Sequence, residues 1–348
     1  MRLQIVSKRW STGRGNFTSV ERFCSLLIPD FGASHGKLMK IPYRLGQWLK
    51  GLSNSRVAGA FPGPYNSYSA QIELQGIWEA FKKKPDVVFF PYADYDYYYM
   101  QWGKKLIGCK VVLWSFFSEW ELKNRFKNLM HFEKADLILV AGHGQFRYMS
   151  SQLPNSNVRF FPLGVDTSFF APTQEWDPFT IVHSGANRRD FDTLIRAFDR
   201  LVVHHPQCRL ELIGASSARE KIPYRPYLTI HGELSDREML KVYQKSNFLV
   251  LSVTDGGSSN SLNEGMACGL PVIVTAVTNI TDYVDDSFSL LFGINDDLQL
   301  FEKMMVLMGN REVRDCYSKN ARNHALQYDW FKLKDDFYEL LSSQGCHA

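Results

Sequence analysis

One segment of the chain, Asn247–Val284, constrains the fold more than any other. It opens with a short apolar run, Phe248–Val253, whose length and Leu/Val content predict a buried strand. A polar loop rich in glycine and serine follows, and then a stretch compatible with a helix, Leu262–Cys268, which a glycine and a proline end. A second apolar run, Val272–Val277, predicts another strand. The segment therefore predicts one strand–helix–strand unit of a parallel sheet, and with it an α/β fold.

The loop of this unit has the character of an anion site. Gly256, Gly257, Ser258 and Ser259 leave the backbone accessible, so their N–H groups can face a ligand beside the positive end of the following helix. Glu264 lies in that helix, and a carboxylate next to a phosphate site suits hydroxyl groups, such as those of a ribose. The alternative is that the glycines only form a turn and Glu264 is a solvated helix residue; spacing alone leaves both open.

The run SLNEGMACGLPVIV resembles the donor-site motif of the GT4-type retaining glycosyltransferases of group 1. That family has the GT-B fold, an α/β architecture of two Rossmann-like domains with parallel sheets that face each other across a cleft. Glu264 matches the second glutamate of the motif, and Met266–Gly269 with Pro271 matches the run that follows it. The resemblance implies that Glu264 holds the ribose hydroxyls of a nucleotide sugar, with Asn263 in the same donor site.

The first glutamate of the motif is replaced by a glycine. Its position is Gly256, and the nearest carboxylate is Asp255, one residue earlier. In the family the first glutamate contacts the transferred sugar. The resemblance therefore leaves two expectations open: Asp255 takes over this role, or the backbone amides of the loop hold the sugar.

A second predicted strand-to-helix turn carries two arginines. It lies between a strand predicted over Phe179–Ser184 and an amphipathic helix predicted over Asp190–Leu201. Arg188 and Arg189 can bind phosphate oxygens there, although a pair of surface arginines would give the same pattern. In the family this turn carries an arginine and a lysine that bind the donor diphosphate. Arg189 aligns with the lysine, and Arg188 stands in for the arginine.

Two further parts of the donor site follow from the same resemblance. Leu3–Val6 predicts the first strand, and the loop after it contains Gly13 and Gly15, which are expected to face the donor diphosphate. A plain turn is the alternative for these glycines. Leu234 precedes a helix predicted over Asp236–Ser246 and is expected near the nucleobase.

The length of 348 residues fits two domains of ordinary size. We expect an N-terminal Rossmann-like acceptor-binding domain at 1–171, a C-terminal Rossmann-like nucleotide-sugar-binding domain at 172–328, and a closing helix at 329–348 that crosses back to the N-terminal domain. Residues 29–70 are expected to form irregular connections with short strands and helices, and Phe126–Phe132 is expected to form a helix. The tyrosines between 65 and 99 favour core packing, with a sugar-stacking platform as the alternative.

Composition argues against several other classes of protein. No run of 18 apolar residues predicts a transmembrane helix, and a net charge of +4 is too small for a nucleic-acid-binding surface. The six cysteines include no CxxC pair, which predicts neither a metal site nor a disulfide framework and fits a reducing cytoplasm. Basic clusters at Lys82–Lys84 and Lys123–Lys127 suit a solvated face or peripheral contact with the anionic inner face of a membrane.

The resemblance implies that the protein is a glycosyltransferase. It would move a sugar from a UDP- or GDP-linked donor to a hydroxyl of a growing glycan, a lipid-linked acceptor or a small molecule, as in polysaccharide biosynthesis. The resemblance implies retention of configuration without a metal or another cofactor, with Arg189, Glu264 and Asp255 as catalytic residues. The alternatives are an inverting GT-B enzyme, a nucleotide-sugar epimerase, and a non-catalytic GT-B protein that binds nucleotide or glycan as a partner subunit.

Overall fold

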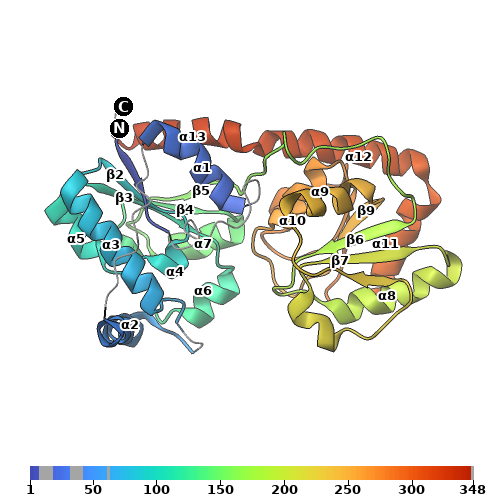
Figure 1. Ribbon diagram of the computed structural model, residues 1–348, viewed down its shortest axis with the longest axis horizontal. Coiled ribbons are helices and arrows are strands. Elements are labelled where there is room, and N and C mark those ends of the chain that lie inside the picture. Colours follow the sequence, from blue (N-terminus) through green and yellow to red (C-terminus); the bar gives the residue numbers. More distant parts are fainter. Residues whose placement is uncertain (8–18, 32–41, 61–62, 346–348) are drawn as a thin grey trace. The chain divides into compact units, whose positions relative to one another are not determined.

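The computed structural model describes residues 1–7, 19–31, 42–60 and 63–345 of the chain (Figure 1). Contacts within this part group it into two units. Residues 1–7, 20–162 and 333–345 form the N-terminal unit, and residues 163–332 form the C-terminal unit. Each unit is described by itself below.

The N-terminal unit contains a parallel sheet whose described strands follow one another in chain order. They are β1 (Leu3–Ile5), β2 (Val87–Phe90), β3 (Lys110–Ser115), β4 (Leu137–Val140) and β5 (Val158–Phe160). Each strand pairs in parallel with the next, so that Val88 lies beside Val111 and Leu113 beside Ile138. The inner strands are fully apolar in their centres because helices cover both faces of a parallel sheet.

Helices lie on both faces of this sheet (Figure 1). They are α1 (Ser19–Phe31), α2 (Tyr43–Val57), α3 (Ser67–Lys83), α4 (Ala93–Asp96), α5 (Met100–Ile107), α6 (Glu119–Arg125), α7 (His143–Gln152) and most of α13 (Trp330–Ser343), with a short 3-10 turn at Phe132–Lys134. On one face, the ring of Phe23 (α1) packs edge-on against the rings of Trp114 (β3) and Phe337 (α13). The distances between ring centres are 5.6 Å and 5.4 Å.

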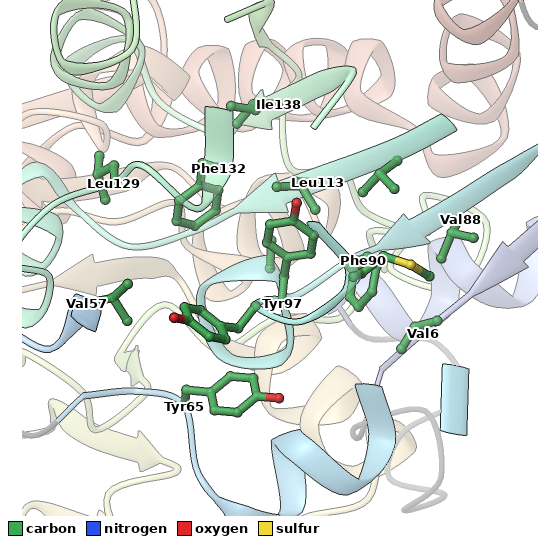
Figure 2. Close-up of a cluster of buried hydrophobic side chains, with 14 of the residues drawn as sticks. Val6, Val57, Tyr65, Val88, Phe90, Tyr97, Leu113, Leu129, Phe132 and Ile138 are labelled. Carbon is green, nitrogen blue, oxygen red and sulfur yellow. The ribbon is translucent and has the colours of Figure 1, made fainter. Parts of the chain in front are cut away.

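The opposite face of the sheet packs against α3, α5 and α7 and forms a second apolar core. Figure 2 shows Phe90, Leu113 and Ile138 from neighbouring strands turned toward Tyr97 and Phe132 in this core. Tyr65, Tyr92, Tyr97 and Tyr98 are all less than 7% exposed, so core packing is confirmed for these four tyrosines.

Two expectations for the N-terminal unit are wrong. The helix expected over Phe126–Phe132 lies earlier, at α6, because Ser118 caps it and Glu121 returns the hydrogen bond in a capping box. The described residues of the stretch 29–70 are mainly helical rather than irregular, because they include α2 and the start of α3. The apolar pattern of α2 is weak, and its packing against α3 supplies the stability that its own sequence lacks.

The C-terminal unit contains a six-stranded parallel sheet in the order β11-β10-β9-β6-β7-β8. Its strands are β6 (Thr180–Ser184), β7 (Arg209–Ile213), β8 (Leu228–Ile230), β9 (Phe248–Leu251), β10 (Val272–Thr275) and β11 (Ser289–Phe292). The chain leaves β6 toward β7 and β8, and then returns to place β9 on the other side of β6. The strand order therefore reverses between β6 and β9, which is the switch point where open α/β sheets bind ligands.

Helices also cover both faces of the C-terminal sheet (Figure 1). They are α8 (Phe191–His204), α9 (Asp236–Lys245), α10 (Asn260–Ala267), α11 (Asp297–Gly309) and α12 (Arg311–Ala325), with 3-10 turns at Ser216–Lys221, Thr281–Tyr283 and Leu326–Tyr328. α8 and α11 enclose an apolar core on one face, in which Phe198 and Met304 are fully buried. α9, α10 and α12 lie on the other face (Figure 1).

The segment that follows β5 is bound into the C-terminal unit. The Arg322 guanidinium donates hydrogen bonds to the carbonyls of Thr167 at 3.0 Å, Phe170 at 2.8 Å and Ala267 at 2.7 Å. These contacts hold residues 167–170 in the C-terminal unit. The contacts within each unit divide the chain at 162/163 and at 332/333, and the sequence predicts boundaries at 171/172 and 328/329.

Candidate donor site

The two segments that the sequence singled out lie next to each other at the switch point. Arg188 and Arg189 follow β6, and the glycine–serine loop follows β9. The Thr254 N–H donates to the Arg188 carbonyl at 2.9 Å, and Arg189 forms an isolated antiparallel bridge with Val253. Because both loops leave the carboxyl ends of adjacent parallel strands, their residues converge on one edge of the sheet.

Arg189 folds back over the turn that carries it. Its Nε donates to the Ser184 carbonyl at 2.9 Å. Gly185 has a φ of +93°, a backbone conformation that favours glycine, and a Cβ there would lie 2.6 Å from the Arg189 Nη2, which would have to shift. Burial lowers the pKa of Arg189 to about 10, which still leaves the guanidinium protonated at neutral pH. The turn therefore presents a fixed positive charge at the end of β6.

Glu264 lies on α10 with 4% of its surface exposed. The hydroxyl of Tyr243, on α9, lies 3.1 Å from Glu264 Oε2 and 3.0 Å from Ser184 Oγ. Ser261 Oγ donates to the same Ser184 Oγ at 3.0 Å. Burial raises the pKa of Glu264 to about 7, the Tyr243 hydrogen bond opposes this shift, and the charge of Asp236 adds to it. Glu264 is thus a buried hydrogen-bond acceptor whose pKa lies near neutral pH.

Ser184 joins the two predicted halves of the site. Its carbonyl accepts from Arg189, and its hydroxyl lies in the chain that runs through Tyr243 to Glu264. We refer to Ser184, Arg189, Tyr243, Ser261 and Glu264 as the Ser184 cluster. A positive and a negative group are thereby held in one hydrogen-bonded unit, as the binding of a diphosphate next to a ribose requires.

The position of the missing first glutamate is closed to any side chain. A Cβ at Gly256 would lie 2.0 Å from the Thr278 carbonyl oxygen. The Gly256 carbonyl also accepts a hydrogen bond of 2.8 Å from Asn279 Nδ2, which fixes the loop against the end of β10. A glutamate at this position would need a different loop conformation. Asp255, next to it, is half-buried in the same loop.

The rest of the loop leads into the N-terminus of α10. Gly257 and Ser258 are half-buried, and Ser259 is the N-cap residue, 8% exposed. The Ser259 side chain does not cap the helix, and within the described part of the chain its hydroxyl oxygen has no hydrogen-bond partner. The first N–H groups of the helix have no partner inside the helix, and they give this end a partial positive charge.

The remaining predicted residues have different surroundings. Asn263 is fully buried, and its Nδ2 donates to the Leu163 carbonyl at 2.7 Å, so this side chain ties α10 to the segment after β5. Leu234 is half-buried in the turn before α9, close to Asp236, whose charge acts on Glu264. Gly13 and Gly15 lie outside the described residues.

The sequence alone did not predict three members of the cluster, Ser184, Tyr243 and Ser261, or the supporting residue Asn279. In the sequence, Tyr243 is only an apolar position of an amphipathic helix, and no motif indicates a role for its hydroxyl. In the sequence, Ser184 is only the last residue of the strand predicted over Phe179–Ser184. Asn279 has a φ of 70°, a left-handed conformation that asparagine tolerates well, and this preference is the one signal that a sequence offers for it.

Among the residues that the structure describes, no group of three or more His, Cys, Asp or Glu side chains lies close enough together to hold a metal ion. No helix in the described part combines the length and apolar character needed to cross a membrane.

Comparison with known proteins shows a partial match to one family and a shared fold. The model of the family described as glycosyl transferases group 1 matches residues 178–310. An uncharacterised glycosyltransferase of Methanocaldococcus jannaschii is 31% identical over 107 residues, which is 30% of this chain and 30% of that protein. The chain spans between 30% and 42% of the length of the curated relatives it matches.

Two solved structures share the architecture of the whole chain. Sucrose-phosphate synthase from Thermosynechococcus elongatus has a TM-score of 0.71 at 14% identity, covering 99% of this chain and 98% of that one. HepE of Anabaena, in complex with UDP and glucose, has a TM-score of 0.66 at 12% identity, covering 92% and 89%. Residues 178–310 thus match the model of the group 1 glycosyl transferases, and the solved structures show that the fold of the chain is GT-B.

Proposed function

We propose that this protein transfers a sugar from a nucleoside diphosphate sugar to a hydroxyl group of an acceptor. The Ser184 cluster carries this proposal, because it holds a guanidinium and a carboxylate together at the switch point of a group 1 glycosyltransferase domain. The HepE structure, which has the same fold, contains UDP and glucose and supports a donor of this class. Both UDP- and GDP-linked donors remain within the proposal.

Each group has a distinct part in donor binding. Glu264 accepts hydrogen bonds from the two ribose hydroxyls, which a carboxylate does well with its two oxygens. Arg189 and the first N–H groups of α10 bind the diphosphate, Arg188 adds a second guanidinium, and no metal ion is required. Asp255 and the amides of Gly257 and Ser258 face the transferred sugar. Leu234 lies on the side of the nucleobase.

The transfer step depends on stabilising the negative charge that develops on the departing diphosphate. The bond between the anomeric carbon and the diphosphate oxygen breaks, and negative charge accumulates on the departing diphosphate. Arg189 and the N-terminus of α10 stabilise that charge, which is electrostatic transition-state stabilisation. The acceptor oxygen forms the new bond on the same face, and its proton passes to the departing phosphate, so the configuration is retained.

A donor panel tests this proposal. The protein is incubated with UDP- and GDP-sugars, with and without EDTA, and released nucleotide and the anomeric configuration of any product are followed by NMR. The proposal expects release of one nucleotide that EDTA does not reduce, and an α product from an α-linked donor. A β product from an α-linked donor would establish an inverting enzyme and contradict the proposed step, and free sugar epimerised at another carbon would contradict transfer.

One observation favours a second candidate, a protein that binds a nucleotide sugar without turning it over. The loop position that holds a carboxylate in the family motif cannot hold any side chain here, because the Thr278 carbonyl blocks it. Nucleotide binding without release of nucleotide from any donor, in the presence of glycan and lipid-linked acceptors, would establish this candidate.

A further inference from the structure

Tyr243 is fully buried, and its hydroxyl lies between two other members of the Ser184 cluster. The hydroxyl oxygen is 3.1 Å from Glu264 Oε2 on α10 and 3.0 Å from Ser184 Oγ at the end of β6. The Tyr243 ring packs edge-on against the ring of Phe170, with 6.2 Å between the ring centres. A ring that is packed this closely holds its hydroxyl in one place, so the hydroxyl can fix the carboxylate that it contacts.

The hydroxyls of the cluster form a chain of hydrogen bonds with one direction. An ionised carboxylate only accepts hydrogen bonds, so the Tyr243 hydroxyl donates to Glu264. Because a phenol has a single proton, the Tyr243 oxygen accepts the hydrogen bond that it shares with Ser184. Ser261 in turn donates to Ser184 at 3.0 Å. The charge of Glu264 therefore sets the direction of the whole chain, and each donor strengthens the next one.

The contact with Tyr243 uses only part of the Glu264 carboxylate. It takes one lone pair of Oε2. The other oxygen, Oε1, is not fully enclosed and accepts no hydrogen bond from the part of the chain that the structure describes. A carboxylate has about four lone pairs, so Oε1 and the second lone pair of Oε2 are left for the hydroxyls of a ribose.

We propose that Tyr243 is a positioning residue for nucleotide binding, whose hydroxyl keeps the Glu264 carboxylate both oriented and charged toward the ribose. The inference rests on the proposed function, because it names the residue through which the ribose site acts. Tyr243 contacts neither donor nor acceptor and acts only through Glu264. A merely structural hydroxyl would stabilise the fold without changing the charge of the site.

The groups around Glu264 explain why this hydrogen bond is important near neutral pH. Burial raises the pKa of Glu264 to about 7, the hydrogen bond from Tyr243 opposes this rise, and the charge of Asp236 adds to it. Burial also raises the pKa values of Tyr243 and Cys268, so both stay neutral. Arg189, whose charge acts on Tyr243, has a pKa of about 10 and stays protonated. Glu264 is therefore the group of this set that changes charge around pH 7.

The substitution Tyr243→Phe keeps the ring and removes the hydroxyl. A protonated Glu264 carries no charge and offers fewer acceptor sites, so nucleotide affinity falls as the pH drops through the pKa of Glu264. Without the hydroxyl this fall begins at a higher pH, because a hydrogen bond to a charged group changes an equilibrium constant by about 10- to 100-fold. The ratio of dissociation constants, variant over wild type, is expected to be roughly 10 or more at pH 6.5 and to shrink at least about fivefold by pH 8.5.

Isothermal titration calorimetry with UDP and with GDP, between pH 6.5 and 8.5, measures this ratio. The titration of the nucleotide itself cancels, because it is the same for both proteins. Tyr227→Phe is the matched control: the Tyr227 hydroxyl also donates to a carboxylate, Asp199 Oδ1, at 2.7 Å, in the same unit but outside the cluster. The control is expected to bind within about twofold of the wild type at every pH.

Two further variants keep the test independent of how well Tyr243→Phe folds. Ser184→Ala leaves the Tyr243 side chain in place and removes the hydroxyl behind it. Its ratio to the wild type is expected to be at least about twofold larger at pH 6.5 than at pH 8.5. Glu264→Gln cannot ionise, so adding Tyr243→Phe to it is expected to change the affinity by the same factor at both pH values, within about twofold.

A ratio for Tyr243→Phe that is equal at pH 6.5 and 8.5 would overturn the proposal, as would an equal pH-dependent loss in Tyr227→Phe. If Tyr243→Phe does not fold, a pH-independent ratio for Ser184→Ala overturns it instead. The proposed function survives either result as long as the wild-type protein binds a nucleotide and Glu264→Gln weakens that binding. A wild-type protein that binds neither nucleotide contradicts both.

Discussion

Gly256 is the residue at which this site departs furthest from the pattern it otherwise resembles. The family resemblance alone implies that the loss of the glutamate at this position removes a contact with the transferred sugar. The structure adds a physical cause, since the Thr278 carbonyl occupies the space of a Cβ. The close approach involves residues on two different loops, and no spacing rule in the sequence predicts it.

The substitution Gly256→Ala tests this close approach. The added methyl group must displace the Thr278 carbonyl or the loop, which we expect to lower the free energy of unfolding by about 1–3 kcal/mol and to weaken nucleotide binding. Gly309→Ala is the matched control, because a Cβ there meets no atom within 4 Å. Urea unfolding measures the stability of both variants. An unchanged urea midpoint for Gly256→Ala would contradict the close contact between Gly256 and the Thr278 carbonyl.

At the scale of elements, a buried carboxylate holds α3 to the turn before α5. Glu73 is fully buried and accepts hydrogen bonds from the Tyr65 hydroxyl at 2.6 Å, the Tyr98 N–H at 2.7 Å and the Met100 N–H at 2.9 Å. Burial raises the pKa of Glu73 to about 7, although these hydrogen bonds oppose the shift.

The raised pKa predicts a pH dependence of stability. A carboxyl whose pKa is about 4.5 unfolded and about 7 folded stabilises the fold fully below pH 4.5, and this contribution is lost as the pH rises through 7. The loss from Glu73 is at most about 3 kcal/mol, at 1.36 kcal/mol per pKa unit. Glu73→Gln keeps the shape and removes the charge, so its stability is expected to fall less than that of the wild-type protein over this range.

Urea midpoints from pH 4.5 to 8 measure this difference. Glu79→Gln, six residues later on the same helix, is the control for the loss of one carboxylate, since Glu79 lies at the surface and pairs with Lys83. Asp94 and Glu264, whose pKa values burial raises to about 6 and about 7, titrate in the same window, so only the difference between variant and wild type reports on Glu73. Parallel curves for Glu73→Gln and wild type would contradict the assignment.

The elements also show what the sequence can predict and what it cannot. The strands of the C-terminal unit are short apolar runs bounded by turn residues, and β6, β9 and β10 occur where they were expected, within two residues at each end. The predicted position of helix α6 was wrong because the prediction followed the apolar residues at 126–132 and not the capping box at Ser118 and Glu121. The sequence did not predict α3 at its full length. Its buried face includes Glu73, whose hydrogen-bond partners come from the distant 98–100 segment.

At the scale of the whole molecule, the strand order brings together two loops that the motifs alone do not place side by side. Two loops about 70 residues apart in the chain become neighbours because β6 and β9 pair in the sheet. The sequence predicted both loops, Arg189 and Glu264, but it did not predict that Ser184 and Tyr243 link them. These two residues belong to the site only through the packing of α9 and α10 against the same edge, which depends on the tertiary fold.

The central claim is that Arg189 and Glu264 act together in binding a nucleoside diphosphate, and isothermal titration calorimetry with UDP and with GDP tests it most directly. The variants are Arg189→Met and Glu264→Gln, with Arg200→Met as control, because Arg200 lies exposed on α8 and pairs with Asp297. We expect one of the two nucleotides to bind the wild-type protein and the control equally. Each site variant should lose roughly 10- to 100-fold in affinity, the worth of one or two charge-assisted hydrogen bonds. Folded Arg189→Met and Glu264→Gln proteins that bind this nucleotide as tightly as the wild type would contradict the account, as would a wild-type protein that binds neither.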